Sequence, residues 1–306
     1  MRIVFLGNAQ WSVPALAALV RSSHGVAAVV TSPPRPAGRG HEVRPNAVGR
    51  AARDLGLELV ETGDDLVPIL EPLAPDVLAV VAFGRILPQA ALDLARVAPV
   101  NLHFSLLPAL RGASPVQSAI LAGASRTGVT TIRMVAALDA GPIYGQREAT
   151  IAPEEDAGAL GARLADLGAE LLVETVDALA AGSATARPQD DAAATTCRKL
   201  GATDRPLRFA DEDAVASVRR VRALAPEPGA TVAFRGDPLQ VLAAREEPSS
   251  PAGGPGEVVA VDRDGIVVAA RAGAIRFLEV APAGRRRMAA ADFARGARIA
   301  VGERFA

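Results

Sequence analysis

The segment Arg2-Ile3-Val4-Phe5-Leu6-Gly7-Asn8-Ala9-Gln10-Trp11-Ser12-Val13-Pro14 predicts the class of the fold. Its apolar run, Ile3 to Leu6, is typical of a buried strand. Ser12 then predicts the cap of a helix that carries Pro14 in its first turn, with apolar residues at helical spacing beyond it. A buried strand that turns into an amphipathic helix predicts the first half of a strand–helix–strand unit.

The same alternation continues through the first third of the chain. Short apolar runs recur at residues 26–30, 57–60 and 77–81, separated by segments with helical patterns. Such alternation predicts an α/β domain, a mostly parallel sheet flanked by helices, which we expect at residues 1–190. The turn after the first strand lacks the three glycines of a dinucleotide fingerprint, so neither NAD nor FAD is expected.

The rest of the chain changes pattern. Residues 153–182 predict one long amphipathic helix, and residues 191–206 are polar and suit a linker. A further helix is expected at 211–224. Short apolar runs separated by glycine and proline follow at 231–234, 239–243, 258–261, 266–269 and 275–280. Five short strands predict that residues 207–306 form a smaller C-terminal β-barrel of the oligonucleotide-binding type.

Composition argues against a membrane protein, a secreted protein and a metalloprotein. Half of the 306 residues are apolar, yet no apolar stretch reaches the roughly 20 residues that span a bilayer, and the chain starts with a strand rather than a signal peptide. The single cysteine, Cys197, excludes an internal disulfide and lacks the partners of a zinc site. We therefore expect a cytoplasmic protein without a metal, and a monomer by default because no coiled-coil heptads occur.

Three polar residues of the first domain can carry chemistry. Asn101 and His103 lie two apart at the end of an apolar run, so in an extended chain their side chains leave the same face. An amide can donate to an oxyanion, and an imidazole can take or give a proton. Asp139 can orient the imidazole and raise its pKa. We expect Asn101, His103 and Asp139 to be catalytic residues for acyl transfer to an amine.

These residues lie in motifs that resemble the folate-dependent formyltransferases. The motifs keep that family's order and spacing: Asn101-x-His103-x-Ser105-Leu106-Leu107-Pro108, Arg111-Gly112-Ala113-Ser114-Pro115, Thr127-Gly128-Val129-Thr130 and Leu138-Asp139-Ala140-Gly141. Residues 255–258 and 282–293 are similar to the family's C-terminal barrel. The resemblance covers nearly the whole chain.

The resemblance also implies substrates. The chain looks most like the branch that moves the formyl group of the co-substrate 10-formyltetrahydrofolate to the α-amine of methionine on initiator tRNA, for translation initiation. In that interpretation one loop and one strand end hold the folate: Ser105, Leu106, Leu107, Pro108, Val81, Phe83 and Gly84.

Arginine-rich segments supply the expected tRNA contacts. Residues 35–40, Arg-Pro-Ala-Gly-Arg-Gly, resemble a loop that this branch uses on the acceptor stem, and guanidinium groups suit a phosphate backbone. The residues expected to bind tRNA are Arg35, Arg39 and Arg44, with Arg285, Arg286 and Arg287 in the barrel. A solvated surface is the alternative for each cluster, because arginines are frequent and Lys199 is the only lysine.

The sequence motifs also fit other functions. The same catalytic set serves an N-formyltransferase acting on an amino-sugar nucleotide or another small amine, or a hydrolase that releases formate. A catalytically silent RNA-binding protein is the alternative without chemistry, and the intact Asn-His-Asp set argues against it. Gly7-Asn8-Ala9 also stands where the family usually has Gly-Thr-Pro, which affects the expected acceptor pocket.

Overall fold

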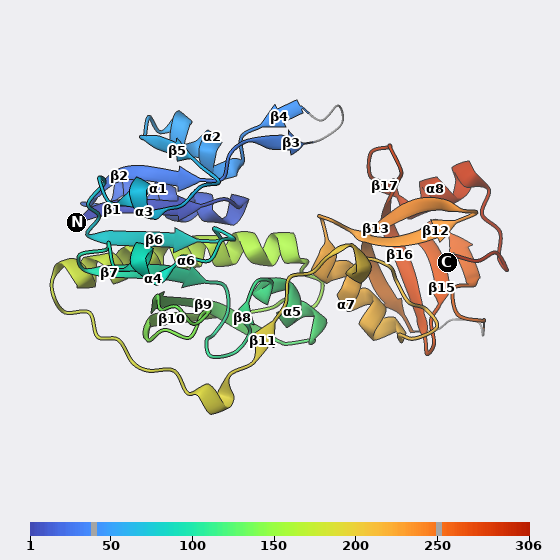
Figure 1. The fold of residues 1–306 in the computed structure, drawn as a ribbon. Helices are drawn as coiled ribbons and strands as arrows, with labels where there is room; N and C mark the ends of the chain where they lie inside the picture. The colour runs from blue at the N-terminus through green and yellow to red at the C-terminus, as the bar shows by residue number, and fades with distance from the viewer. Residues whose placement is uncertain (38–41, 249–252) are drawn as a thin grey trace. The chain divides into compact units, whose positions relative to one another are not determined.

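The computed structural model describes residues 1–37, 42–248 and 253–306, and the chain divides into two compact units (Figure 1). The first unit comprises Met1–Pro115, Arg126–Thr150 and Gly161–Arg198. The second comprises Val116–Ser125, Ile151–Leu160 and Lys199–Ala306. Within the described ranges, no helix has both the length and the apolar character that crossing a membrane requires.

A seven-stranded sheet forms the centre of the first unit, in the order β10-β9-β7-β6-β1-β2-β5. Its strands are β1 (Arg2–Gly7), β2 (Gly25–Thr31), β5 (Leu59–Glu61), β6 (Val77–Val81), β7 (Ala98–His103), β9 (Arg126–Arg133) and β10 (Ile143–Thr150). The first five are parallel, and β9 and β10 add an antiparallel edge. The predicted mostly parallel sheet is confirmed.

Helices connect these strands, and Ser12 is the N-cap residue of the first of them as predicted, but its side chain makes no capping hydrogen bond. Ser12 ends a 3-10 turn, η1 (Gln10–Ser12), and its buried hydroxyl donates to the carbonyl of Val81 at 2.7 Å. A buried hydroxyl needs a partner, and the end of β6 is the acceptor within reach. The helices of this part of the chain are α1 (Val13–Arg21), α2 (Ala47–Asp54), α3 (Val67–Leu70), α4 (Gln89–Leu92), α5 (Pro115–Leu121) and α6 (Ala157–Ala180).

Two short ribbons complete the first unit. Strands β3 (Arg35–Ala37) and β4 (Glu42–Arg44) pair antiparallel, so the arginine-rich segment begins and ends as a ribbon rather than as the open loop expected. Strands β8 (Arg111–Gly112) and β11 (Thr196–Cys197) pair in parallel. The second ribbon brings the segment after α6 onto the loop that follows β7.

The second unit contains an antiparallel sheet in the order β12-β13-β16-β15-β14, with β17 on β16. Its elements are β12 (Ala230–Phe234), β13 (Asp237–Glu247), β14 (Val258–Asp262), β15 (Gly265–Ala269), β16 (Ala274–Pro282), β17 (Met288–Ala289), α7 (Ala214–Leu224) and α8 (Ala290–Ala297). All five predicted strands are present. Phe305 and Arg304 bridge to Phe234 and Glu257, which covers both edges of the sheet. A barrel of the oligonucleotide-binding type stays a prediction.

Helix α6 packs closely on β7 and on the turn after β1. A Cβ atom at Gly168 would lie 2.8 Å from the Leu102 side chain, and one at Gly161 would lie 2.1 Å from the Trp11 ring. The hydroxyls of Thr131 and Thr175 add a buried hydrogen bond of 2.8 Å between β9 and α6. The two glycines let the helix approach Leu102, which precedes His103, and Trp11, which follows β1.

We expect Gly161→Ala to lower the free energy of unfolding by about 1 to 3 kcal/mol, because the added methyl group overlaps the Trp11 ring. This loss exceeds the roughly 1 kcal/mol that alanine gains over glycine in a helix. Gly296→Ala in α8 is the matched control, since a Cβ there meets nothing within 4 Å. Urea unfolding, followed for the unit that carries each change, measures both effects. An equally stable Gly161→Ala variant would contradict the close packing.

Candidate functional site

The structure brings together the three residues predicted to be catalytic. Asn101 and His103 lie at the end of β7, between β6 and β9. Asp139 lies in the connection between β9 and β10, with one carboxylate oxygen 3.4 Å from Asn101 Nδ2 and the other 3.6 Å from His103 Nδ1. The backbone N–H of Gly112 donates to the second oxygen at 2.9 Å. An amide, an imidazole and a carboxylate thus share one small site.

The imidazole of His103 is buried between two oxygen acceptors. Its Nε2 lies 3.0 Å from the carbonyl of Leu110, and its Nδ1 faces Asp139. Burial is the largest effect and lowers the pKa of His103, while the Asp139 charge and the Leu110 carbonyl act to raise it. The net shift is downward, opposite to the shift expected from Asp139 alone, so the buried ring favours its neutral form.

Two residues that face this ring have left-handed backbone. Leu110 has a φ of 59° and Asp139 a φ of 51°, a region that L residues enter at a cost. Such strain persists only where surrounding contacts hold it. One contact that the sequence did not point to is the side chain of Gln189, whose Nε2 donates to the Asp139 carbonyl at 2.8 Å.

The predicted folate loop directly follows His103 and has a fixed shape. The hydroxyl of Ser105 donates to the carbonyl of Ala109 at 2.6 Å, and its carbonyl accepts from the Thr130 hydroxyl at 2.6 Å. Gln146 donates to the carbonyl of Leu107 at 2.7 Å. The Leu107–Pro108 peptide is cis. Hydrogen bonds from β9 and β10 therefore hold Ser105 to Pro108 beside the catalytic candidates.

The second predicted part of the folate site lies at the end of β6, and only some of its residues line a cavity. Val81 is completely buried, and it is not among the described residues that line a cavity here. Phe83 packs in the core, and with Gly84 it lines a cavity of about 910 Å³. The described lining consists of Asn8, Ala9, Ser32, Pro33, Arg35, Arg44, Pro45, Asn46, Arg50, Gly63, Ala82, Phe83, Gly84 and Arg85.

Positive charge gathers around this cavity. Arg35 and Arg44 are opposite each other in the β3–β4 ribbon, and Arg50 and Arg85 line the same space. Arg39, the third arginine predicted here, lies outside the described residues. The cavity is suited to an anionic ligand.

Asn8, which replaces the family's usual threonine, forms hydrogen bonds to three segments beside the cavity. Its Oδ1 accepts from the Thr31 hydroxyl and from the Ser32 N–H, each at 2.8 Å, and its Nδ2 donates to the carbonyl of Phe83. Asn46 donates to the Thr31 hydroxyl at 2.7 Å while its own Oδ1 caps α2. The altered turn therefore links the ends of β1, β2 and β6.

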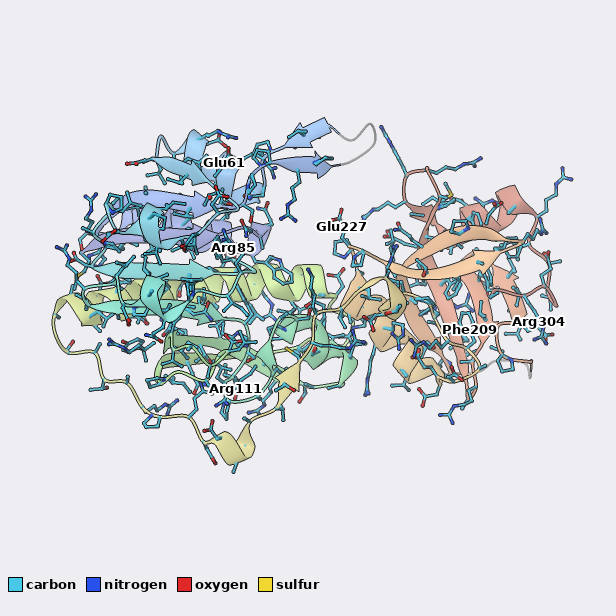
Figure 2. The ribbon with its side chains drawn as sticks, viewed as in Figure 1. Glu61, Arg85, Arg111, Phe209, Glu227 and Arg304 are labelled. Atoms are coloured by element: carbon cyan, nitrogen blue, oxygen red, sulfur yellow. The ribbon has the colours of Figure 1, made fainter. Side chains whose placement is uncertain are left out.

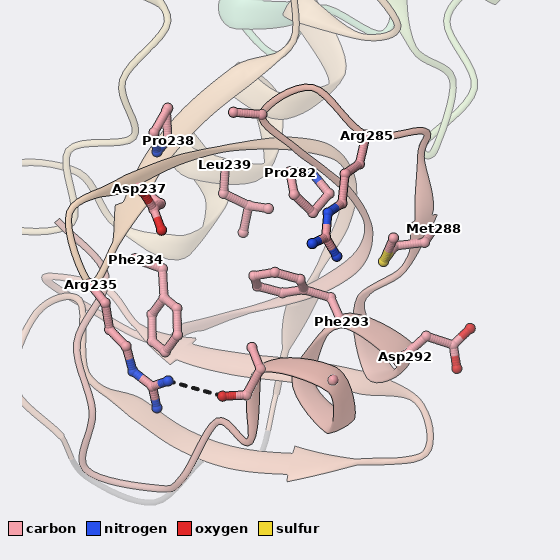
Figure 3. Close-up of a pocket in the computed structure, with 13 residues that line it drawn as sticks. Phe234, Arg235, Asp237, Pro238, Leu239, Pro282, Arg285, Met288, Asp292 and Phe293 are labelled. Atoms are coloured by element: carbon pink, nitrogen blue, oxygen red, sulfur yellow. Dashed lines mark hydrogen bonds between the residues drawn. The ribbon is translucent and has the colours of Figure 1, made fainter.

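The remaining predicted tRNA contacts lie in the second unit. Arg285, Arg286 and Arg287 are all exposed, and Arg287 lies 3.7 Å from Glu279. Arg285 and Phe293 point into a cavity of about 580 Å³ that is bounded by the β12–β13 turn and α8 (Figure 3). A nucleic-acid base can stack on an aromatic ring such as Phe293, and a guanidinium group such as that of Arg285 can bind a phosphate.

Comparisons with known proteins agree over both units. The formyl transferase family matches residues 1–176, and its C-terminal domain matches residues 199–298. Methionyl-tRNA formyltransferase of Solibacter usitatus is 43% identical over 308 residues, which cover 99% of this chain and 98% of that protein. The enzyme of that name from Thermobifida fusca is 44% identical over 309 residues, covering 100% and 99%.

A solved structure shares the fold. HypX from Aquifex aeolicus in complex with tetrahydrofolic acid has a TM-score of 0.71 at 20% identity. The match covers 99% of this chain but 48% of HypX, so the chain spans about half the length of that protein.

The buried imidazole predicts how stability depends on pH. Because the folded pKa of His103 lies below the ordinary value of roughly 6.5, the unfolded chain binds the proton more readily. The contribution to stability is complete above the unfolded pKa and is lost as the pH falls through the folded pKa. Urea unfolding between about pH 8 and about pH 5 should show a smaller loss of stability in His103→Gln than in the unaltered chain. Identical losses in both proteins would contradict the shift.

Proposed function

The chain belongs to the formyl transferase family, and from this premise we propose that it moves the formyl group of 10-formyltetrahydrofolate to the α-amine of methionine on initiator tRNA. The observation that carries the proposal is 43% and 44% identity to two methionyl-tRNA formyltransferases over nearly the whole of both chains. The arginines around the cavity of the first unit support an acceptor that carries phosphates.

In the proposed reaction the amine attacks the formyl carbon and forms a tetrahedral oxyanion, which collapses as the bond to N10 of the folate breaks. Asn101 donates its side-chain N–H to the oxyanion. Its contact with Asp139 supports this role, because 3.4 Å is long for a hydrogen bond and leaves the amide able to donate to a substrate. One such donor typically lowers the barrier by roughly 2.7 to 4 kcal/mol.

The amine proton passes to the pair formed by His103 and Asp139 and returns to N10 of the departing folate. Burial lowers the pKa of His103, which supports a neutral ring ready to accept a proton. The Asp139 carboxylate then stabilises the imidazolium that forms. The hydrogen bond from Gly112 to Asp139 keeps the carboxylate turned toward the ring. Each turnover returns the pair to its starting protonation state.

The two substrates are assigned to different sets of residues. We assign the folate to the loop Ser105 to Pro108 and to the end of β6, including Val81, Phe83 and Gly84. Phosphates of the tRNA are assigned to Arg35, Arg39 and Arg44, and those reaching the second unit to Arg285, Arg286 and Arg287. The shared cavity lining of Phe83, Arg35 and Arg44 supports placing the acceptor end next to the folate.

The first experiment supplies 10-formyltetrahydrofolate with methionyl initiator tRNA, with an amino-sugar nucleotide, or with no acceptor. Formyl product should form on the tRNA. Product only on the small amine would replace the tRNA acceptor, free formate alone would indicate a hydrolase, and no turnover would leave the silent RNA-binding protein as the interpretation.

Asn101→Ala should lower kcat by about 100- to 1,000-fold, because the oxyanion loses a donor. Asp139→Ala should abolish turnover while tRNA binding and the folded state persist. Gln89→Ala is the matched control, since this exposed amide bonds Asp93 on the surface of α4. Initial rates of formyl transfer and filter binding of tRNA measure the two properties. Near-normal rates in either site variant would refute the catalytic assignment.

Arg35→Ala and Arg44→Ala should each raise the KM for tRNA while folate binding stays unchanged. Each variant removes a positive charge from the cavity of the first unit, to which we assign the acceptor end of the tRNA. Each phosphate that a variant no longer neutralises should make the slope of log K against log salt shallower by about 0.7 to 0.9. Arg21→Ala, at the exposed end of α1, is the charge-matched control. Equal losses of tRNA and folate binding would exclude a specific role in tRNA recognition.

A further inference from the structure

The segment after α6 lies along the catalytic loops instead of leading directly away from them. Residues 187–197, here called the strap, include β11, which pairs with β8. The strap carries Gln189 and Thr195, which lie beside Arg111 of β8 (Figure 2). We propose that Gln189 is a positioning residue for formyl transfer, which holds the Asp139 turn so that its carboxylate faces His103. The kinetic part of this inference rests on the proposed function.

Every polar atom of the Gln189 side chain is engaged. Its Nε2 donates to the carbonyls of Asp139 and Gly141, at 2.8 and 2.7 Å. Its Oε1 accepts from Nε and Nη2 of Arg111, at 3.0 and 2.8 Å. Arg111 also pairs with Asp191 of the strap at 2.7 Å. One amide thus joins the turn that carries Asp139 to the loop that follows His103.

The turn that Gln189 holds has strained backbone. Asp139 has left-handed backbone, with a φ of 51°, and Gln189 donates to the carbonyl of this same residue. On the other side the turn is pressed against β9, since a Cβ at Gly141 would lie 1.7 Å from the Arg133 carbonyl oxygen. Loss of the amide leaves the strained residue without this restraint, and a change in φ at Asp139 redirects its carboxylate.

The strap holds the opposite side of the imidazole in the same way. Leu110, whose carbonyl faces His103 Nε2, is the second left-handed residue, with a φ of 59°. Its N–H donates to the Thr195 hydroxyl at 2.9 Å, and the N–H of Arg111 donates to the Thr195 carbonyl at 2.8 Å. Both strained neighbours of the ring are therefore bonded to one segment.

This arrangement makes Gln189 act through Asp139 rather than on the substrate. Among the groups that the structure describes, Asp139 is the charge that faces the His103 ring, and the Leu110 carbonyl is the dipole on its other side. If the carboxylate turns away, burial of the ring continues while the attraction that offsets it weakens. The pKa of His103 then falls further.

Two variants distinguish the hydrogen bonds that the Gln189 amide donates from those that it accepts. Gln189→Met keeps the length of the side chain and removes all its hydrogen bonds, whereas Gln189→Glu keeps the acceptor for Arg111 and loses the donor to the two carbonyls. Both should lower kcat by about 10- to 100-fold, the effect of a misplaced catalytic group, with KM for folate and tRNA within about twofold. Gln89→Ala should leave every parameter unchanged.

The pKa of His103 is the measurement that a merely structural role would not move. NMR titration of the imidazole is practical because the chain has three histidines. In Gln189→Met the His103 pKa should fall below its value in the unaltered chain, and the acid limb of the kcat profile should shift to lower pH. An unshifted pKa, or full activity in Gln189→Glu, would overturn the inference. If the unaltered chain formylates no methionyl-tRNA, the proposed function fails while the titration still decides the role of Gln189.

Discussion

The contact on which the candidate site depends is the enclosure of the His103 ring between the Leu110 carbonyl and the Asp139 carboxylate. Burial favours the neutral ring, and the two oxygens favour the charged ring. The balance depends on small displacements, because the electrostatic attraction weakens as the carboxylate moves away while the cost of burial does not change. A site of this kind needs rigid surroundings, and the strap supplies them through Gln189 and Thr195 while β8 supplies them through Gly112.

The sheet explains why so many functional candidates meet. Parallel strands end at a common edge, and ligands of open α/β sheets bind outside the carboxyl ends of the strands. Asn8 follows β1, Phe83 follows β6, and Asn101 and His103 end β7, so distant parts of the chain contribute to one region. Hydrogen bonds from Asn8 to the ends of β2 and β6 fix the spacing of this edge.

The second unit follows a different plan. Its antiparallel strands enclose a core that includes Val241, Ile275 and Phe277, and its last residues cover the sheet edges. Arg276 is buried with Glu247 and Asp262 as partners, whereas the arginines at 285–287 are exposed. The first guanidinium is therefore a structural element of the fold, whereas the exposed ones, of which Arg287 lies 3.7 Å from Glu279, are those proposed to meet phosphates.

Local patterns in the sequence predict the alternation of strands and helices, the five later strands, and the placement of Asn101 and His103 on one face. These features are periodic, and neighbouring residues encode them. The sequence also predicts Asp139 beside His103, but contacts between distant residues account for the rest. Gln189 holds a turn 50 positions away, the hydroxyl of Ser12 bonds Val81 rather than the helix that follows it, and burial lowers the pKa of His103 although Asp139 acts to raise it. Helix α8 and the β3–β4 ribbon also escaped prediction. Burial and long-range contacts depend on how the whole chain packs, and no local spacing contains that information.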